Sequence, residues 1–184
     1  AAAAVNFSLR FALSRCDAKL IVVRWVPCVY ASVNRYSRDS RKREEPLMAE
    51  AYIIDAVRTP RGIGKQGKGA LADQHPQHLA ATVMKAIKDR NNLDTATVDD
   101  VIWSVSTQDG MQAGDLGRMA ALDAGYDITS SGTTLDRFCG GGITSVSLAA
   151  AQVMSGMEDC VVAGGTEMMS LTAAMQKDKM AAGI

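Results

Sequence analysis

The residue best suited to chemistry in this sequence is Cys139, which lies in the run Asp-Arg-Phe-Cys-Gly-Gly-Gly at residues 136–142. A helix of small residues is expected to begin at this point. The first turn of a helix leaves backbone N–H groups unpaired and carries positive partial charge. A thiol placed there is biased toward the thiolate, the form that attacks carbonyl carbons. Because three glycines follow, a bulky acyl group can approach the sulfur. We therefore predict that Cys139 is the nucleophile of an acyl-transfer enzyme.

The alternative for Cys139 is a small buried core residue, the usual role of a free cysteine. Its position between an expected strand and an expected helix, after the polar pair Asp136 and Arg137, opposes that reading. Arg137 either favours the thiolate or forms an ion pair with Asp136. Cys160 lies inside an apolar strand run and is assigned to the core. Cys16 and Cys28 lie in the N-terminal segment and receive no role. No disulfide framework or cysteine-based metal site is indicated.

His75 and His78 are the only histidines of the chain. Their spacing would permit a shared metal, but no third ligand is evident, so a water-exposed helix start is the expected role. Nothing in the sequence places either histidine beside Cys139. The base that would activate the thiol is therefore not identified. Glu167, which follows the last expected strand, could approach the site, although a structural hydrogen bond is its expected role.

The segment Gly62–Gly67 fits the pattern GxGxxG and follows the first expected strand. A dinucleotide site needs a helix to begin within the motif, and the next helix is expected only near Pro76. No acidic residue ends a second strand at the required offset. A flexible loop is the preferred interpretation, and an NAD(P)-dependent oxidoreductase using Gly62, Gly64 and Gly67 is kept as an alternative function.

Length and composition indicate one globular domain of 184 residues, with 47% hydrophobic and 22% charged residues. The net charge is zero but uneven: residues 1–47 carry 9 basic and 4 acidic residues, and residues 48–184 carry 11 and 16. An acidic body argues against a nucleic-acid partner. No apolar run is long enough to span a membrane, so no membrane partner is expected.

Residues 1–47 form a leader of doubtful status. Their Arg and Ser content resembles a mitochondrial transit peptide, whereas the acidic residues among them favour a mis-assigned start with Met48 as the first residue. Either way the leader is expected to lie outside the fold. A cytoplasmic location is predicted, with the mitochondrion as the alternative if the transit peptide is genuine.

Residues 48–184 alternate strands with helices and predict an α/β domain of order βαβαβαβ, with a mainly parallel sheet and helices on its faces. The strands are expected at residues 51–57, 101–106, 133–136 and 159–163. The first of them is expected to be buried. The helices are expected at residues 76–91, 115–125 and 140–156. The last helix is expected to bury one stripe, made of Ile143, Val146, Ala150, Val153 and Met157.

Several ordered motifs of the body resemble the thiolase family, and they run from Met48 nearly to the end of the chain. They are AVRTP at 56–60, VDDVI at 98–102, GRMAAL at 117–122, DRFC at 136–139 and GMEDCVVAGGTEMMS at 156–170. Two departures stand out: Asp136 replaces the usual Asn, and Gly140–Gly142 replace a Ser-Gly element. A ketoacyl synthase is a closer rival than the oxidoreductase, but the run from Gly164 to Ser170 favours thiolase.

This resemblance implies a thiolase-like N-terminal half, truncated before a second half of the same fold. That second half would carry an activating His, a second catalytic Cys and an Asn/His pair. The implied reaction is acyl transfer to and from coenzyme A through a Cys139 acyl-enzyme, by thiolysis of a 3-ketoacyl-CoA or Claisen condensation of acetyl-CoA. Coenzyme A and acyl-CoA are substrates, no cofactor or metal is bound, and the full-length protein is expected to be a homo-oligomer. The fragment alone is expected to be inactive, and a non-catalytic interaction module is the remaining alternative.

Overall fold

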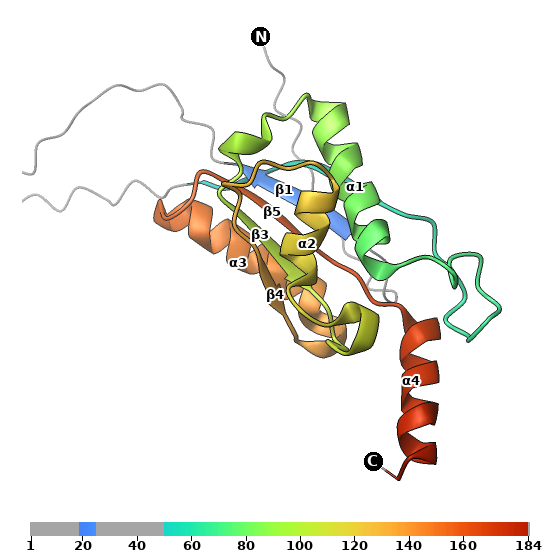
Figure 1. The fold of residues 1–184 in the computed structure, drawn as a ribbon. Coiled ribbons are helices and arrows are strands. Elements are labelled where there is room, and N and C mark those ends of the chain that lie inside the picture. Colours follow the sequence, from blue (N-terminus) through green and yellow to red (C-terminus); the bar gives the residue numbers. More distant parts are fainter. Residues whose placement is uncertain (1–18, 25–49, 184) are drawn as a thin grey trace, which may run out of the picture.

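The computed structural model of the chain describes residues 19–24 and 50–183. Its centre is a five-stranded sheet of order β2-β1-β5-β3-β4 (Figure 1). The strands are β1 (Lys19–Arg24), β2 (Tyr52–Arg58), β3 (Asp100–Ser104), β4 (Thr133–Leu135) and β5 (Cys160–Gly165). The helices are α1 (Pro76–Asn91), α2 (Leu116–Asp123), α3 (Gly141–Ser155) and α4 (Met169–Ala181). Three 3₁₀ turns complete the elements: η1 (Thr95–Thr97), η2 (Gly110–Gln112) and η3 (Phe138–Gly140).

Strand directions confirm the expected α/β class. Strand β3 pairs in parallel with both β4 and β5. Strand β1 pairs antiparallel with both β2 and β5, so β2 runs in the same direction as β5. The four strands expected from the sequence therefore point one way, and among the described strands β1 alone runs in the opposite direction. The carboxyl ends of β3, β4 and β5 consequently meet at one edge of the sheet, where parallel sheets place their sites.

The position of β1 corrects one expectation. Residues 1–47 were expected to lie outside the fold, but Lys19–Arg24 occupies an inner position of the sheet between β2 and β5. Its register with β5 is unbroken, whereas its register with β2 shifts between Val22 and Val23. The rest of the leader lies outside the described residues. The apolar run at residues 20–23 has a composition that suits a strand, but its place inside the sheet could not be predicted because the pairing depends on partners far along the chain.

Helices cover the two faces of the sheet in different ways (Figure 1). Helices α1 and α2 pack on one face, where Trp103 and Val162 belong to the larger core cluster. Helix α3 packs on the other face, where Ile102 and Val161 belong to the second cluster. This division follows from the alternation of side chains along β3 and β5. Helix α4 extends past the sheet, beyond its carboxyl edge (Figure 1).

The sequence located most helix ends correctly. The Asp115 carboxylate accepts a hydrogen bond from the Arg118 N–H and caps α2, as expected. Gly156 ends α3 with φ 74°, in the left-handed region. Helix α1 begins at Pro76, but the left-handed residue that ends it is Asn92 rather than Asn91, with φ 45°.

One burial prediction was wrong, and a second was confirmed only in part, at Val153, Val146 and Ala150. Strand β2 lies at the sheet edge and is largely exposed, with Ile53 and Ile54 each 45% accessible, although a buried strand was expected. On α3 the buried positions are Gly141, Ser145, Ala149 and Val153, whereas Ile143 and Met157 of the expected stripe are exposed. Val146 and Ala150 are partly buried against the second cluster. The sheet-facing side of α3 thus consists mostly of small residues, because the helix lies close to the strands.

Candidate functional site

Cys139 lies in η3, two residues before the first residue of α3, and is exposed. This position excludes the buried-core alternative for Cys139 in this structure. Cys160, by contrast, is 3% exposed and belongs to the larger core cluster, as predicted. Strand β4 and helix α3 thus present Cys139 from the short connection at the carboxyl edge of the sheet, the placement expected from the sequence.

Asp136 and Arg137 take separate partners instead of pairing with each other. An Asp136 Oδ1 atom accepts a hydrogen bond of 2.8 Å from the Phe138 N–H. The Arg137 guanidinium donates to Thr144 Oγ1 on α3 at 3.2 Å. Sequence reasoning left the Arg137 partner open and missed Thr144, since no local pattern links a residue to a helix position seven residues later. The Asp136 hydrogen bond could have been predicted from the sequence, because an Asp side chain often accepts a hydrogen bond from the backbone N–H two residues later.

The beginning of α3 lies unusually close to β3, at Gly141. A Cβ atom at Gly141 would lie 1.7 Å from Ser104 Oγ and 2.8 Å from Ser104 Cβ. Only a residue without a side chain permits this approach. Gly142, one position later, has open space instead, with nothing within 4 Å of a Cβ atom there. The glycines after Cys139 therefore differ in role: Gly141 seats the helix, and Gly142 leaves the surface uncovered.

The N-terminus of α3 has backbone donors available. No side chain caps α3 at Gly140, and none caps η3 at Arg137. The Gly140 and Gly141 N–H groups bond to Arg137 and Phe138 carbonyls, whereas the Cys139 N–H has no hydrogen-bond partner among the described residues. Unpaired N–H groups beside a nucleophile can stabilise the oxyanion of a tetrahedral intermediate.

Hydrogen bonds brace the carboxyl edge of the sheet around the site. Glu167 Oε2 accepts from the Ser106 N–H at 2.8 Å and from the Thr107 N–H at 3.3 Å. Its other oxygen, Oε1, accepts from the Gln112 side chain at 3.2 Å. Glu167 therefore joins the end of β5 to the segment after β3. This is the structural hydrogen-bonding role expected from the sequence.

A shallow depression of about 400 Å³ lies on the outer side of α3, next to Cys139 in the chain. Ile143 and Leu148 contribute apolar surface and are 50% and 46% exposed. Polar groups at its rim include the Arg137 guanidinium. The residues that line it are Arg137, Gly140, Ile143, Thr144, Ser147 and Leu148.

The two histidines lie apart from this site. The His75 ring caps α1 by accepting from the Gln77 N–H, and His78 Nδ1 lies 2.7 Å from Asp123 Oδ2 of α2. Helices α1 and α2 cover the face of the sheet opposite α3 (Figure 1). Neither histidine is placed as the base for Cys139. Within the described part of the chain, no group of three or more His, Cys, Asp or Glu side chains could hold a metal ion.

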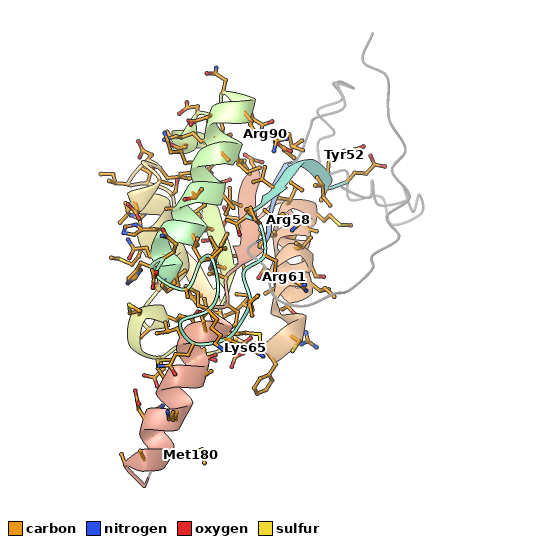
Figure 2. The ribbon with its side chains drawn as sticks, turned by 90° about the vertical axis from the view of Figure 1, so that its right-hand side faces the viewer. Tyr52, Arg58, Arg61, Lys65, Arg90 and Met180 are labelled. Atoms are coloured by element: carbon orange, nitrogen blue, oxygen red, sulfur yellow. The ribbon has the colours of Figure 1, made fainter. Side chains whose placement is uncertain are left out.

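The GxGxxG segment forms bends and turns without a helix, and α1 begins only at Pro76. The geometry required for a dinucleotide pyrophosphate is therefore missing there. Figure 2 shows Arg58, Arg61 and Lys65 spread along the segment that leads from β2 toward α4, so these basic side chains do not converge on one point. The oxidoreductase alternative is not supported.

Comparison with known proteins identifies the family of the chain. The model of the family described as "Thiolase, N-terminal domain" matches residues 51–184. A steroid 3-ketoacyl-CoA thiolase of Mycobacterium tuberculosis is 46% identical over 124 residues, which are 67% of this chain and 30% of that protein. A 3-oxoadipyl-CoA/3-oxo-5,6-dehydrosuberyl-CoA thiolase of Escherichia coli is 41% identical over 124 residues, with the same coverage of both chains.

A solved structure extends the likeness to three dimensions. The acetyl-CoA acetyltransferase of Bacillus anthracis matches with a TM-score of 0.51 and 36% identity, over 55% of this chain and 25% of that one. The chain belongs to the thiolase family and contains its N-terminal domain. It spans about 30% of the length of the curated relatives it matches. Strand β1 lies outside the matched residues 51–184.

Among the described residues, no helix has both the length and the apolar character needed to cross a bilayer.

Proposed function

We propose that this chain supplies the acyl-accepting cysteine of a thiolase-type acyltransferase. In thiolysis the Cys139 thiolate attacks the C3 ketone of a 3-ketoacyl-CoA, and the carbon–carbon bond between C2 and C3 then breaks. In ping-pong order, Cys139 carries the acyl group as a thioester, acetyl-CoA leaves, and the thiol of free coenzyme A then takes the acyl group. The reverse direction is Claisen condensation of two acyl-CoA molecules.

In the thiolysis direction, the electrophile that Cys139 attacks is the C3 ketone of the bound 3-ketoacyl-CoA. The bond from sulfur to C3 forms, and the C2–C3 bond then breaks to release the acetyl-CoA enolate, which takes up a proton. The thioester carbonyl is the point of attack when acetyl-CoA acylates Cys139 in the synthetic direction. Both routes leave the same Cys139 thioester.

One observation carries the proposal: an exposed cysteine lies at an uncapped helix start inside the residues that match the family. The Cys139 N–H, which has no hydrogen-bond partner among the described residues, can donate to an oxyanion that forms at the thiol. The proton of the Cys139 thiol must go to a base, and the described histidines do not reach it. We therefore assign the base, the proton donor for the enolate and a second oxyanion donor to a part of the enzyme outside the described residues.

The substrate class follows from chemistry shared by the relatives. Those named above are 3-ketoacyl-CoA thiolases or an acetyl-CoA acetyltransferase, so their names share an acyl group bound to coenzyme A. We propose a 3-ketoacyl-CoA, with coenzyme A as second substrate and no resident cofactor. A homo-oligomer of the whole enzyme and a cytoplasmic location stay predictions, with the mitochondrion as the alternative.

Acyl transfer to Cys139 is tested by incubating the chain with acetyl-CoA at about pH 9, where thiols ionise without a general base. Acetyl adducts are then mapped by peptide mass spectrometry under acidic conditions that preserve thioesters. The expected adduct lies on the peptide containing Cys139 and is absent from Cys139→Ser. Cys160→Ser is the matched control and should keep the adduct. An unmodified Cys139 peptide, or equal acetylation in Cys139→Ser, would overturn the assignment. Steady turnover of acetoacetyl-CoA by this chain is not expected, because no described base reaches Cys139.

A further inference from the structure

The residue before Cys139 has an unusual backbone conformation. Phe138 has φ 44°, in the left-handed region that residues other than glycine seldom adopt. Its ring is 76% exposed, so burial of the ring does not hold the residue in place. The Phe138 N–H donates to Asp136 Oδ1 at 2.8 Å. This bond is therefore the side-chain interaction that supports Phe138 directly, alongside the backbone hydrogen bonds that follow it.

The turn is connected directly to the beginning of α3. The Gly140 N–H bonds to the Arg137 carbonyl at 3.0 Å, and the Gly141 N–H bonds to the Phe138 carbonyl. On the other side, Thr144 Oγ1 accepts from Arg137 and donates to the Gly140 carbonyl at 3.2 Å. Cys139 is thus held between two side-chain contacts, one before the turn and one from the helix. The direction in which its thiol points depends on the conformation of Phe138.

We propose that Asp136 is a positioning residue for Cys139. Its carboxylate holds Phe138 in the left-handed conformation and so keeps the Cys139 thiol at the start of α3. The role in acyl transfer rests on the proposed function, but the positioning itself does not. An amide oxygen can accept the same hydrogen bond, so Asn at this position would keep the turn. Alanine would lose the acceptor and release the turn.

The test measures the rate at which iodoacetamide alkylates Cys139 in the folded 184-residue chain, followed by peptide mass spectrometry. We expect Asp136→Ala to slow alkylation of Cys139 at pH 7 about threefold, since the thiol leaves the positive helix end. Asp136→Asn should stay within about twofold of the parent rate, because its amide oxygen restores the acceptor. Asp127→Ala is the matched control: Asp127 Oδ1 accepts from the Thr129 N–H at 2.9 Å in the same local pattern, away from Cys139.

A second variant separates positioning from general stability. Glycine adopts positive φ without a supporting hydrogen bond, so adding Phe138→Gly to Asp136→Ala should restore the parent alkylation rate. An unchanged rate in Asp136→Ala would overturn the proposal. The proposal would also be overturned if Asp136→Asn or Asp127→Ala slowed alkylation of Cys139 as much as Asp136→Ala does, or if the double variant did not recover the parent rate. Because alkylation needs no acyl-CoA, these outcomes are independent of whether Cys139 carries an acyl group.

Discussion

Replacing Gly141 by alanine is the sharpest perturbation of the contact between α3 and the sheet. The new Cβ would lie 1.7 Å from Ser104 Oγ and 2.8 Å from Ser104 Cβ, so rotation of the hydroxyl alone cannot relieve the overlap. Overpacking of this kind costs about 1–3 kcal/mol of folding free energy. Gly142→Ala is the matched control, because nothing lies within 4 Å of its Cβ. Alanine there should stabilise the helix by up to ~1 kcal/mol.

Urea unfolding followed by far-UV circular dichroism measures both variants. We expect Gly141→Ala to unfold at lower urea than the parent and Gly142→Ala at equal or higher urea. Ser104→Gly removes both clashing atoms and should recover most of the loss when combined with Gly141→Ala, whereas Ser104→Ala should recover less because its Cβ remains. Equal stability of Gly141→Ala and Gly142→Ala would refute the close approach of α3 to β3.

Three further predictions concern the sheet and the start of β5. A chain that begins at Met48 lacks β1 and leaves the facing edges of β2 and β5 unpaired. Its melting temperature in a calorimetric scan should therefore be at least ~5 °C lower than that of the 184-residue chain. An unchanged melting temperature would exclude β1 from the sheet. Asp99 Oδ2 accepts hydrogen bonds from the Asp159 and Cys160 N–H groups. Asp99→Ala should therefore lower the free energy of unfolding, measured in urea, by about 1–3 kcal/mol. Stability equal to that of the parent would contradict this role of Asp99. Burial raises the pKa of Glu158, and the negative charges of Asp99, Asp100 and Asp159 raise it further. Ionised Glu158 therefore destabilises the fold, so Glu158→Gln should stabilise it at pH 7. Below the ordinary Glu pKa of 4.5 the carboxyl is protonated in both the folded and unfolded chain, and the substitution should have no such effect. A gain in stability that persists at low pH would contradict this cause.

Sequence patterns predicted much of the fold because helix ends carry local signals. Asp115 and Gly156 mark their helix ends by chemistry that acts within a few residues. The pairing of β1 carried no such signal, because it depends on distant strands. The predicted α3 stripe was correct at Val153 and wrong at Ile143 and Met157, because hydrophobicity alone favours burying large residues. Close packing on the sheet instead selects Gly141, Ser145 and Ala149.

The candidate site, like the fold, was predictable from the sequence only where local residues carry the signal. Cys139 was identified from its neighbours in sequence, namely the polar pair before it and the glycines after it. The contact of Thr144 with Arg137 could not be identified, because it forms only when α3 takes its place beside the turn. The different roles of Gly141 and Gly142 also depend on tertiary structure, since only the distance to Ser104 separates them.

Competitive labelling of the folded chain tests the central claim most directly. A limiting amount of iodoacetamide is added with and without acetyl-CoA, and the peptides containing Cys139 and Cys160 are quantified over time. The exposed Cys139 should react well before the buried Cys160, and acetyl-CoA should slow only the reaction at Cys139, where the acyl group blocks the sulfur. Faster labelling of Cys160, or labelling of Cys139 that acetyl-CoA leaves unchanged, would contradict Cys139 as the acyl-accepting nucleophile.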